Sequence, residues 1–168
     1  EDMKTFSERI YNEASRLITL VEDIMKLSKL DEGAVELEKE EVDFYALTRE
    51  ICSRLAPQAE NRHVRLEVTG ESVNYHGVRQ VLDEMLYNMI ENAIKYNKES
   101  GLVSVWVGNT LQGIKIIVRD TGIGIPKEEQ ERIFERFYRV DKSHSKATGG
   151  TGLGLSIVKH GALMHGAK

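Results

Sequence analysis

The sequence predicts an α+β domain, with helices packed on one face of a mixed sheet, preceded by one long helix. Apolar residues keep a helical spacing from residue 2 to residue 30, and from residue 34 short alternating segments intersperse with helical ones. Residues 121–150 contain glycine, charge and a few aromatics and fit no compact element. A loop of that length is usually functional or disordered, so it gives the first indication of a ligand.

The composition is that of a folded, mildly acidic chain. Its 168 residues are 40% hydrophobic and 30% charged, which suffices for one globular core and an appendage. A net charge of -4 without a basic block disfavours nucleic acid and anionic lipid as partners. Cys52 is the single cysteine, so we expect no disulfide and a reducing compartment. The apolar runs are far too short to cross a bilayer, so we expect the chain to be cytoplasmic.

The first helix is predicted over residues 2–30, with Gly33 as its stop signal. Its apolar positions step by four and three, the spacing of a seam that packs against other helices. An ordinary core helix would show the same seam, but a length of roughly 40 Å favours a bundle or coiled-coil arm. The seam consists of Ile10, Ala14, Leu17, Val21 and Ile24.

The elements that follow are read from alternation and helical spacing. Strands are predicted at 35–42, 64–68, 73–76, 103–107 and 114–120, with a hairpin turn at 108–113. Helices are predicted from the capping residue Asp43 to about Glu60, over 78–96, and from about Gly152 to His165. The apolar face of the helix over 78–96 consists of Val81, Leu82, Met85, Met89 and Ala93.

The first chemical constellation lies on that helix. Asn88 and Asn92 are four residues apart, so both amides lie on one face, and Lys95 follows on nearly the same face. Two carboxamide oxygens and an ammonium could hold a metal ion and a polyphosphate, since magnesium prefers oxygen ligands. Taken alone, a solvated polar face explains this stripe better.

The second constellation begins where an apolar strand ends. Asp120 is followed by Gly122 and Gly124, which puts a carboxylate beside backbone that can approach a ligand closely. A carboxylate can accept a hydrogen bond from the exocyclic amine of a purine. A plain turn explains this segment equally well.

Two further segments complete the set. Residues 134–139 read FERFYR, and their arginines could reach phosphate, although a satellite hydrophobic cluster is the alternative. Residues 149–155 read GGTGLGL directly before a helix, where free backbone N–H groups and the helix dipole favour an anion. The segment is neither a Walker loop, since no lysine with serine or threonine follows, nor a Rossmann fingerprint, since no strand precedes it.

Together these segments resemble the sequence boxes of sensor histidine kinases. LYNMIENAIKYN at 86–97 resembles the N box, DTGIGIP at 120–126 the first glycine box, FERFYRVDKS at 134–143 the F box, and GGTGLGLSIVKH at 149–160 the second glycine box. RLITLVEDIMKLSKLDEG at 16–33 resembles the second helix of the family's dimerisation hairpin and its linker. The resemblance covers essentially the whole chain from residue 34, and it is greatest to membrane-bound bacterial sensors of phosphate or envelope state.

The resemblance implies a Bergerat-type α/β sandwich over 34–168 that binds ATP and magnesium, with 1–33 as part of a dimerisation hairpin. Magnesium ligation is implied for Asn88 and Asn92. The implied nucleotide-binding residues are Asn88, Asn92, Lys95, Tyr96, Asp120, Gly122, Gly124, Ile125, Arg136, Arg139, Gly150, Thr151, Gly152, Leu153, Gly154 and Leu155.

Two departures from the family pattern stand out. The family's H box has a histidine, then an acidic residue, then a proline, and no such string surrounds His63, His76, His144, His160 or His165. We therefore assign no catalytic residue in this chain and expect the phosphoacceptor elsewhere. The strand pair that follows the last helix in the family is also missing, so we expect the chain to be trimmed at both ends.

The expected function is transfer of the terminal phosphate of Mg-ATP to a histidine on a dimerisation domain, for relay to the receiver domain of a response regulator. The expected partners are a second kinase subunit, through the dimerisation helices, and that regulator. A membrane would be reached only through segments missing here, as in a cytoplasmic domain of an inner or plasma-membrane sensor. An ATP hydrolase needs a water-activating acid, against which the F box argues, and a scaffold without catalysis would not need four intact boxes.

Overall fold

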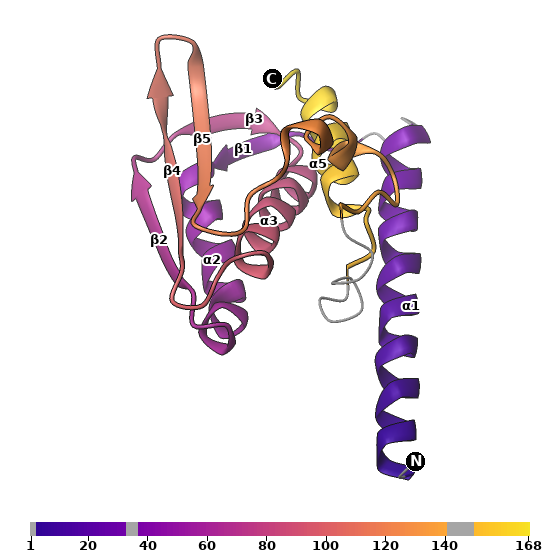
Figure 1. Cartoon of the computed structure of the whole chain (residues 1–168). Coiled ribbons are helices and arrows are strands. Elements are labelled where there is room, and N and C mark those ends of the chain that lie inside the picture. The colour runs from indigo at the N-terminus through magenta and orange to yellow at the C-terminus, as the bar shows by residue number, and fades with distance from the viewer. Residues whose placement is uncertain (1–2, 33–36, 141–149) are drawn as a thin grey trace.

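The computed structural model describes residues 3–32, 37–140 and 150–168, and it confirms the α+β fold class. The elements run in the order shown in Figure 1. They are α1 (Met3–Glu32), β1 (Glu40–Asp43), α2 (Phe44–Asn61), β2 (Arg65–Gly70), β3 (Asn74–Gly77), α3 (Arg79–Lys95), β4 (Leu102–Thr110), β5 (Gly113–Asp120), the 3-10 turns η1 (Lys127–Glu129) and η2 (Arg132–Phe134), and α5 (Gly154–Met164).

The strands form two sheets. In the larger sheet β4 lies between β2, to which it is parallel, and β5, to which it is antiparallel. β1 and β3 form a separate antiparallel pair. The helices α2 and α3 lie on one side of the strands (Figure 1), so the sandwich has a sheet layer and a helix layer.

The core follows from the two periodicities of the sequence. Val103, Val105 and Val107 alternate along β4 and are fully buried, as a half-buried strand requires. The apolar face predicted for α3 is partly wrong: Leu86 and Ile90 reach the core, whereas Met85 and Met89 are only half-buried. Leu86 and Ile90 are buried in addition to the predicted face because α3 is covered on two sides. Its Met85 side lies against Gly161 of α5, and its Leu86 side lies against the sheet.

Local signals fixed the start of α2 but not every boundary. The Asp43 carboxylate accepts hydrogen bonds from the N–H groups of Tyr45 and Ala46, as predicted for a capping residue. The predicted strand at 35–42 is wrong in extent, since pairing with β3 covers only Glu40–Asp43, and residues 33–36 lie outside the described ranges. The predicted turn at 108–113 shrinks to two residues, because β4 and β5 stay paired up to Thr110 and Gly113.

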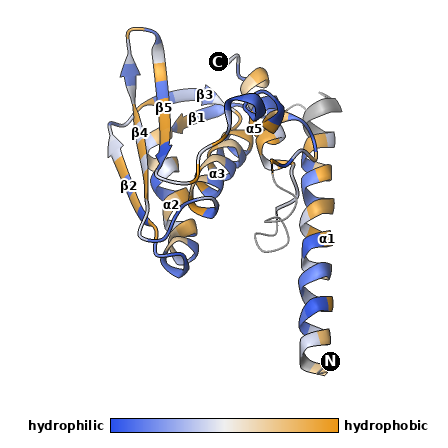
Figure 2. Ribbon diagram, in the orientation of Figure 1, coloured by the Kyte–Doolittle hydropathy of each residue, from blue (hydrophilic) through white to orange (hydrophobic). Residues whose placement is uncertain are grey.

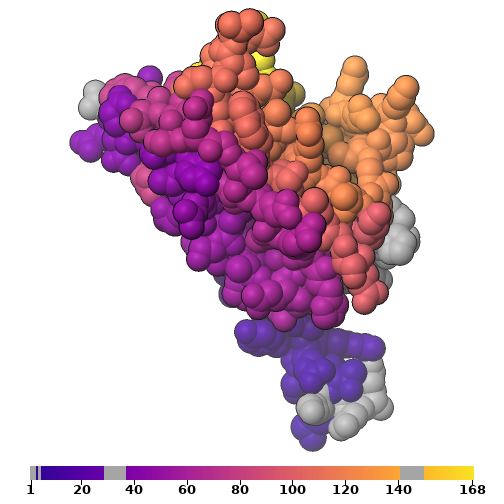
Figure 3. All heavy atoms as spheres, turned by 90° about the vertical axis from the view of Figure 1, so that its left-hand side faces the viewer, coloured from indigo at the N-terminus to yellow at the C-terminus, as the bar shows by residue number. Residues whose placement is uncertain are grey.

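The long helix is confirmed as α1, and it lies beside the sandwich rather than within it (Figure 1). Leu27, only 3% exposed, packs with Leu153 and Ile157 at the start of α5. The predicted seam lies on other sides of the helix and stays exposed, with Ile10 at 56% and Val21 at 55%. In the space-filling view α1 projects beyond the sandwich (Figure 3), and apolar bands recur along it (Figure 2). No helix among the described residues is both long and apolar enough for a membrane span.

Candidate nucleotide-binding site

The polar stripe of α3 faces the glycine segment that precedes α5. The Asn88 Nδ2 atom donates to the carbonyl of Glu84 at 2.7 Å, which directs its Oδ1 atom to the other side. There it lies so close to Gly154 that a Cβ atom at residue 154 would be 2.6 Å from Oδ1. The structure thus brings Asn88, in the segment at 86–97, next to Gly154, in the glycine segment at 150–155.

Lys95 is the last residue of α3, and its side chain reaches the glycine segment. A Cβ atom at Gly150 would be 2.5 Å from Lys95 Nζ, and Arg139 Nη1 donates to the Gly150 carbonyl at 2.5 Å. The Nζ atom also lies 5.4 Å from the centre of the Tyr96 ring. Burial lowers the pKa of the Lys95 ammonium, Glu91 opposes this, and the charges of Arg139 and Arg62 lower it further. Cations therefore surround Gly150, where an anion would be stabilised.

The turn after β5 is fixed against the end of α3. Asp120 ends β5, and its Oδ1 atom accepts a 2.8 Å hydrogen bond from the Gly122 N–H. The Ile123 N–H donates to the Tyr96 carbonyl at 3.1 Å. A Cβ atom at Gly122 would be 2.4 Å from that same carbonyl oxygen, so only glycine allows this approach. Asp120 thus stays exposed beside the Tyr96 end of α3.

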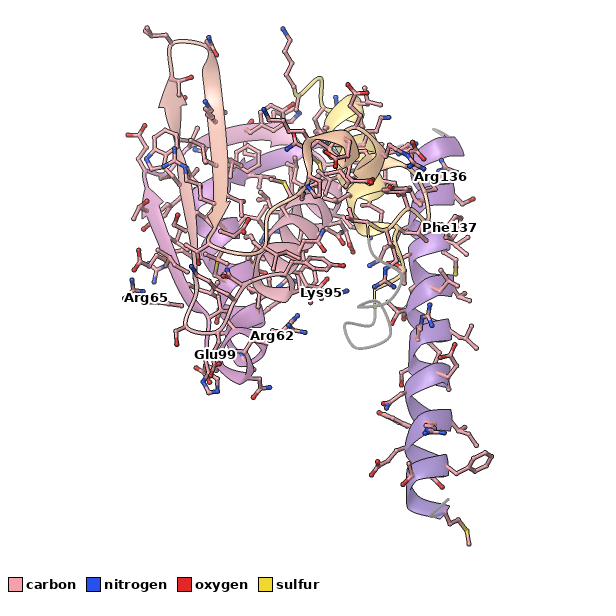
Figure 4. The ribbon with its side chains drawn as sticks, in the orientation of Figure 1. Arg62, Arg65, Lys95, Glu99, Arg136 and Phe137 are labelled. Atoms are coloured by element: carbon pink, nitrogen blue, oxygen red, sulfur yellow. The ribbon has the colours of Figure 1, made fainter. Side chains whose placement is uncertain are left out.

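Residues 134–139, in the segment that resembles the F box, contact the glycine segment at 150–155 through their backbone. The Phe137 N–H donates to the Gly152 carbonyl at 3.0 Å, and Gly152 has a positive φ of 77° against the Phe137 backbone. The two arginines of the segment diverge. Arg139 reaches Gly150, whereas Arg136 lies against His160 Nε2 at 3.3 Å, apart from Lys95 (Figure 4).

Among the predicted binding residues, Thr151 and Leu153 hold the glycine segment against α1, whereas Gly124 and Ile125 are exposed. The Thr151 hydroxyl donates to the Asp23 carboxylate of α1 at 2.6 Å and accepts from the Leu153 N–H at 3.3 Å. The Leu153 side chain is fully buried against Leu27, and Leu155 is half-buried. Gly124 has a positive φ of 71°, and the exposed Ile125 accepts a hydrogen bond from Gln130 at its carbonyl. Gly149 and residues 141–148 lie outside the described ranges.

Comparison with known proteins agrees with this geometry. Residues 77–168 match the family described as Histidine kinase-, DNA gyrase B-, and HSP90-like ATPase. The chain belongs to this family. It is 40% identical over 167 residues to the Sensor-like histidine kinase SenX3 of Mycobacterium bovis, covering 98% of this chain and 40% of that relative. This histidine kinase-like chain therefore spans about 40% of the length of that curated relative.

Solved structures share its fold, among them that of a histidine kinase. Full-length ShkA in complex with AMPPNP matches with a TM-score of 0.80 and 25% identity, over 99% of this chain and 35% of that one. ThkA in complex with the response regulator protein TrrA matches with a TM-score of 0.67 and 26% identity, over 83% of this chain and 41% of that one. SenX3 and ThkA, both histidine kinases, place the chain on the histidine kinase side of the family.

The described histidines of this family member occupy structural positions. His165 accepts at Nε2 from the Val78 N–H at 3.1 Å, while its Nδ1 atom lies 2.8 Å from the Gly161 carbonyl. It thereby joins the end of α5 to the start of α3. His76 pairs with Glu41 across the small sheet, and His63 lies in the turn after α2. His144 lies outside the described residues.

Five charged residues near the site were missed by sequence reasoning. Arg62 donates to the Lys95 carbonyl, Asp23 accepts from Thr151, and Lys26 forms a 3.0 Å ion pair with Glu84. The pKa of Glu91 is raised, chiefly by burial. The charge of Asp23 raises it further, and the charges of Lys95 and Lys26 oppose the shift. Glu91 lies within the segment at 86–97, three residues after Asn88, so a local signal was present for it. The other charged residues lie outside the four segments, where no local signal could have singled them out.

The residues present fit a magnesium-bound polyphosphate. Among the described residues no group of three histidine, cysteine, aspartate or glutamate side chains could hold a metal ion. Magnesium does not need such a group, because it is commonly held by few protein oxygens together with phosphate oxygens and waters. The Oδ1 atom of Asn88 is an oxygen directed at the glycine segment, so a metal beside phosphates suits this donor set.

A separate hollow of about 450 Å³ lies between residues 37–40 and the start of α3. Charged side chains dominate its lining, and several of these are already paired, as in the Arg54–Asp83 contact of 2.5 Å and the Lys26–Glu84 pair. It contains neither Asp120 nor Lys95. The hollow therefore lies apart from the candidate nucleotide-binding residues at the Lys95 end of α3.

Proposed function

We propose that this chain binds Mg-ATP and serves as the catalytic portion of a sensor histidine kinase. The observation that carries the proposal is the position of Lys95 Nζ against Gly150, beside Arg139, at the helix end to which the Asp120 turn is fixed. In this proposal Asp120 accepts from the purine, and Lys95 and Arg139 beside Gly150 bind the polyphosphate at the same end of α3. The complex of the similar protein ShkA with AMPPNP supports the same assignment by analogy.

Each group has a definite task in this proposal. The Asp120 carboxylate accepts a hydrogen bond from the purine amine, and the backbone of Gly150 and Gly152 approaches the phosphates. Lys95 and Arg139 neutralise phosphate charge, and Asn88 with Asn92 would hold magnesium. Magnesium, when bound, neutralises charge that develops on the transferred phosphoryl group. The protein contributes positioning and electrostatics rather than covalent chemistry.

The phosphoryl acceptor in the proposal is a histidine on a dimerisation hairpin, of which residues 1–33 supply the second helix and the linker. Residues 34–168 form the ATP-binding domain. The phosphate would then pass to a receiver domain, for which the ThkA structure with its response regulator gives support by analogy. A second kinase subunit would join through the dimerisation helices. We assign the chain to the cytoplasmic side of a membrane sensor.

Radiolabelled ATP tests the proposal. The purified chain should bind Mg-ATP yet incorporate no acid-labile, base-stable phosphate. Transfer needs an imidazole held in line with the terminal phosphate at near-attack distance, and no histidine of this sequence stands in an H-box string. Adding a dimerisation hairpin with its own H box should restore transfer. The transfer should be weak, because a separate hairpin lacks the covalent tether, which contributes an effective concentration of about 1 mM or more.

Two results would contradict the proposal. Stoichiometric phosphohistidine on the chain alone would show that the acceptor has been misjudged. Rapid release of inorganic phosphate without the hairpin would favour a hydrolase. The Glu99→Gln variant changes an exposed carboxylate in the turn after α3 and should behave as the native chain in each assay.

A further inference from the structure

Arg62 is a cation beside the candidate nucleotide site that none of the four sequence segments includes. It caps the C-terminal end of α2, where its backbone N–H donates to the Ala59 carbonyl at 3.1 Å. The next residue, His63, has a positive φ of 54° as the chain turns toward β2. The Arg62 side chain therefore starts from a fixed point of the fold, and it lies next to Lys95 (Figure 4).

The guanidinium contacts α3 through one backbone atom. Arg62 Nη1 donates a 2.9 Å hydrogen bond to the carbonyl oxygen of Lys95. Lys95 is the last residue of α3, so its carbonyl is one of the four that a helix leaves without an intrahelical partner. A cation at this end also interacts favourably with the helix dipole. Arg62 thereby fixes the backbone from which the Lys95 side chain reaches Gly150.

Charge provides a second link. The positive charges of Arg139 and Arg62 both act on the half-buried Lys95 ammonium, and Glu91 is the carboxylate that opposes them. Three cations thus converge from the end of α2, the end of α3 and the segment after η2. Their mutual repulsion is unfavourable, and attraction to the negative charge of a polyphosphate would outweigh it.

We propose that Arg62 is a positioning residue for polyphosphate binding, which holds the Lys95 end of α3 and favours nucleotides with more phosphates. The proposal rests on the nucleotide site proposed above and extends it to a residue outside the four segments. Arg62 acts through Lys95 and through its charge, so its effect grows with the charge of the ligand rather than with the fit of the base.

Calorimetry with Mg-ATP, Mg-ADP and adenosine tests this proposal on the whole chain. In Arg62→Gln the affinity for Mg-ATP should fall on the order of tenfold, that for Mg-ADP less, and that for adenosine by less than about twofold. Arg65→Gln is the matched control. Arg65 lies three residues on, pairs with Glu67 at 3.0 Å and points away from the site (Figure 4), so all three affinities should stay within about twofold.

Arg62→Lys separates charge from hydrogen-bond geometry. It keeps the positive charge, so the ratio of ATP to adenosine affinity should stay within about threefold of native, even if the melting temperature falls. If Arg62→Gln does not fold, a tenfold loss of this ratio in Arg62→Lys overturns the proposal.

Other outcomes are equally decisive. If Arg62→Gln leaves the ratio of Mg-ATP affinity to adenosine affinity unchanged, Arg62 acts only as a helix cap and the inference is overturned. A native chain that binds none of the three ligands would contradict the proposed function, and the inference would fall with it.

Discussion

Asp120 and Lys95 are held in place by backbone contacts at the two sides of Tyr96. The Asp120 turn is anchored because the Tyr96 carbonyl accepts from Ile123 and because Gly122 has no side chain. Lys95 is anchored as the last residue of α3. The side chains proposed to bind the two ends of a nucleotide are therefore both positioned by the C-terminal end of α3.

Replacing Asp120 by Asn should weaken adenine nucleotide binding by about 1–3 kcal/mol. The carboxylate offers acceptors only, whereas the amide places a donor where a purine amine needs an acceptor. The internal hydrogen bond from Gly122 can survive on the remaining carbonyl oxygen, so the fold should be kept. Calorimetry with ATP measures the change, and Glu99→Gln is the control. Equal ATP affinity of the native and Asp120→Asn chains would contradict the role given to Asp120.

Lys95→Met should stabilise the free chain while weakening ATP binding more than tenfold. In the folded chain the pKa of Lys95 is lowered, chiefly by burial and then by Arg139 and Arg62. At a pH below that lowered pKa, the protonated ammonium costs folding free energy. As the pH rises from the lowered pKa toward the ordinary value of 10.5, the unfolded chain holds more protons, so this cost is progressively lost.

Denaturant unfolding at neutral and alkaline pH measures this effect. The advantage of Lys95→Met over the native chain should shrink as the pH rises through that window. Lys98→Met, three residues on and exposed in the turn after α3, is the control and should show no such pH-dependent advantage. A Lys95→Met chain less stable than native at neutral pH would mean that packing, not desolvation, decides this position.

At the scale of elements, α1 is joined to the sandwich through the glycine segment. The apolar contact is between Leu27 and the Leu153–Ile157 side of α5, and two polar contacts flank it. These are the hydrogen bond from Thr151 to Asp23 and the ion pair of Lys26 with Glu84. Burial lowers the pKa of Lys26, but the hydrogen bond to Glu84 and the charge of Glu84 raise it by more, so the pKa of Lys26 is raised overall. The position of α1 and the shape of the glycine segment are therefore coupled.

Asp23→Ala should loosen this contact by about 1 kcal/mol, because the Thr151 hydroxyl loses a charged acceptor. Hydrogen exchange should then speed up in residues 150–158 and in the second half of α1, while β4 stays protected. The neighbouring exposed Glu22 provides the control variant Glu22→Ala. Exchange that is the same in both variants would show that the apolar contact alone holds the helix.

At the scale of the whole molecule, α1 presents an apolar stripe that the rest of the described chain does not cover. Ile10, Leu17, Val21 and Ile24 are each between 44% and 56% exposed. An apolar surface of that extent on a single projecting helix marks an interaction site. We expect it to drive self-association at raised concentration.

Sedimentation over a range of concentrations checks this expectation. Replacing Leu17 and Val21 by Ser should lower the association constant at least about tenfold, since each buried aliphatic side chain contributes about 1.5–3 kcal/mol. Leu111→Ser removes a fully exposed apolar residue from the β4–β5 hairpin and should change nothing. A chain that stays monomeric throughout, with the stripe in solvent, would contradict the expectation.

Much of this molecule could be predicted because the signals were local. The 3.6-residue spacing of α1, α2, α3 and α5 and the alternation of β4 lie within single elements. The Asp43 cap and the glycine turn after Asp120 need only a few neighbouring residues. Boundaries were less certain, as at β1, because its extent depends on pairing with β3.

The sequence by itself determined the fold class, the long first helix and the order of the four chemical segments. Only the tertiary structure decided which charged groups meet, since this depends on how α3, α5 and α1 pack. That packing separates Arg136 from Arg139, brings Arg62 to Lys95 across 33 positions and Asp23 to Thr151 across 128. It also turns Leu27 rather than the predicted seam toward the sandwich. Such contacts join residues far apart along the chain, so no local spacing records them.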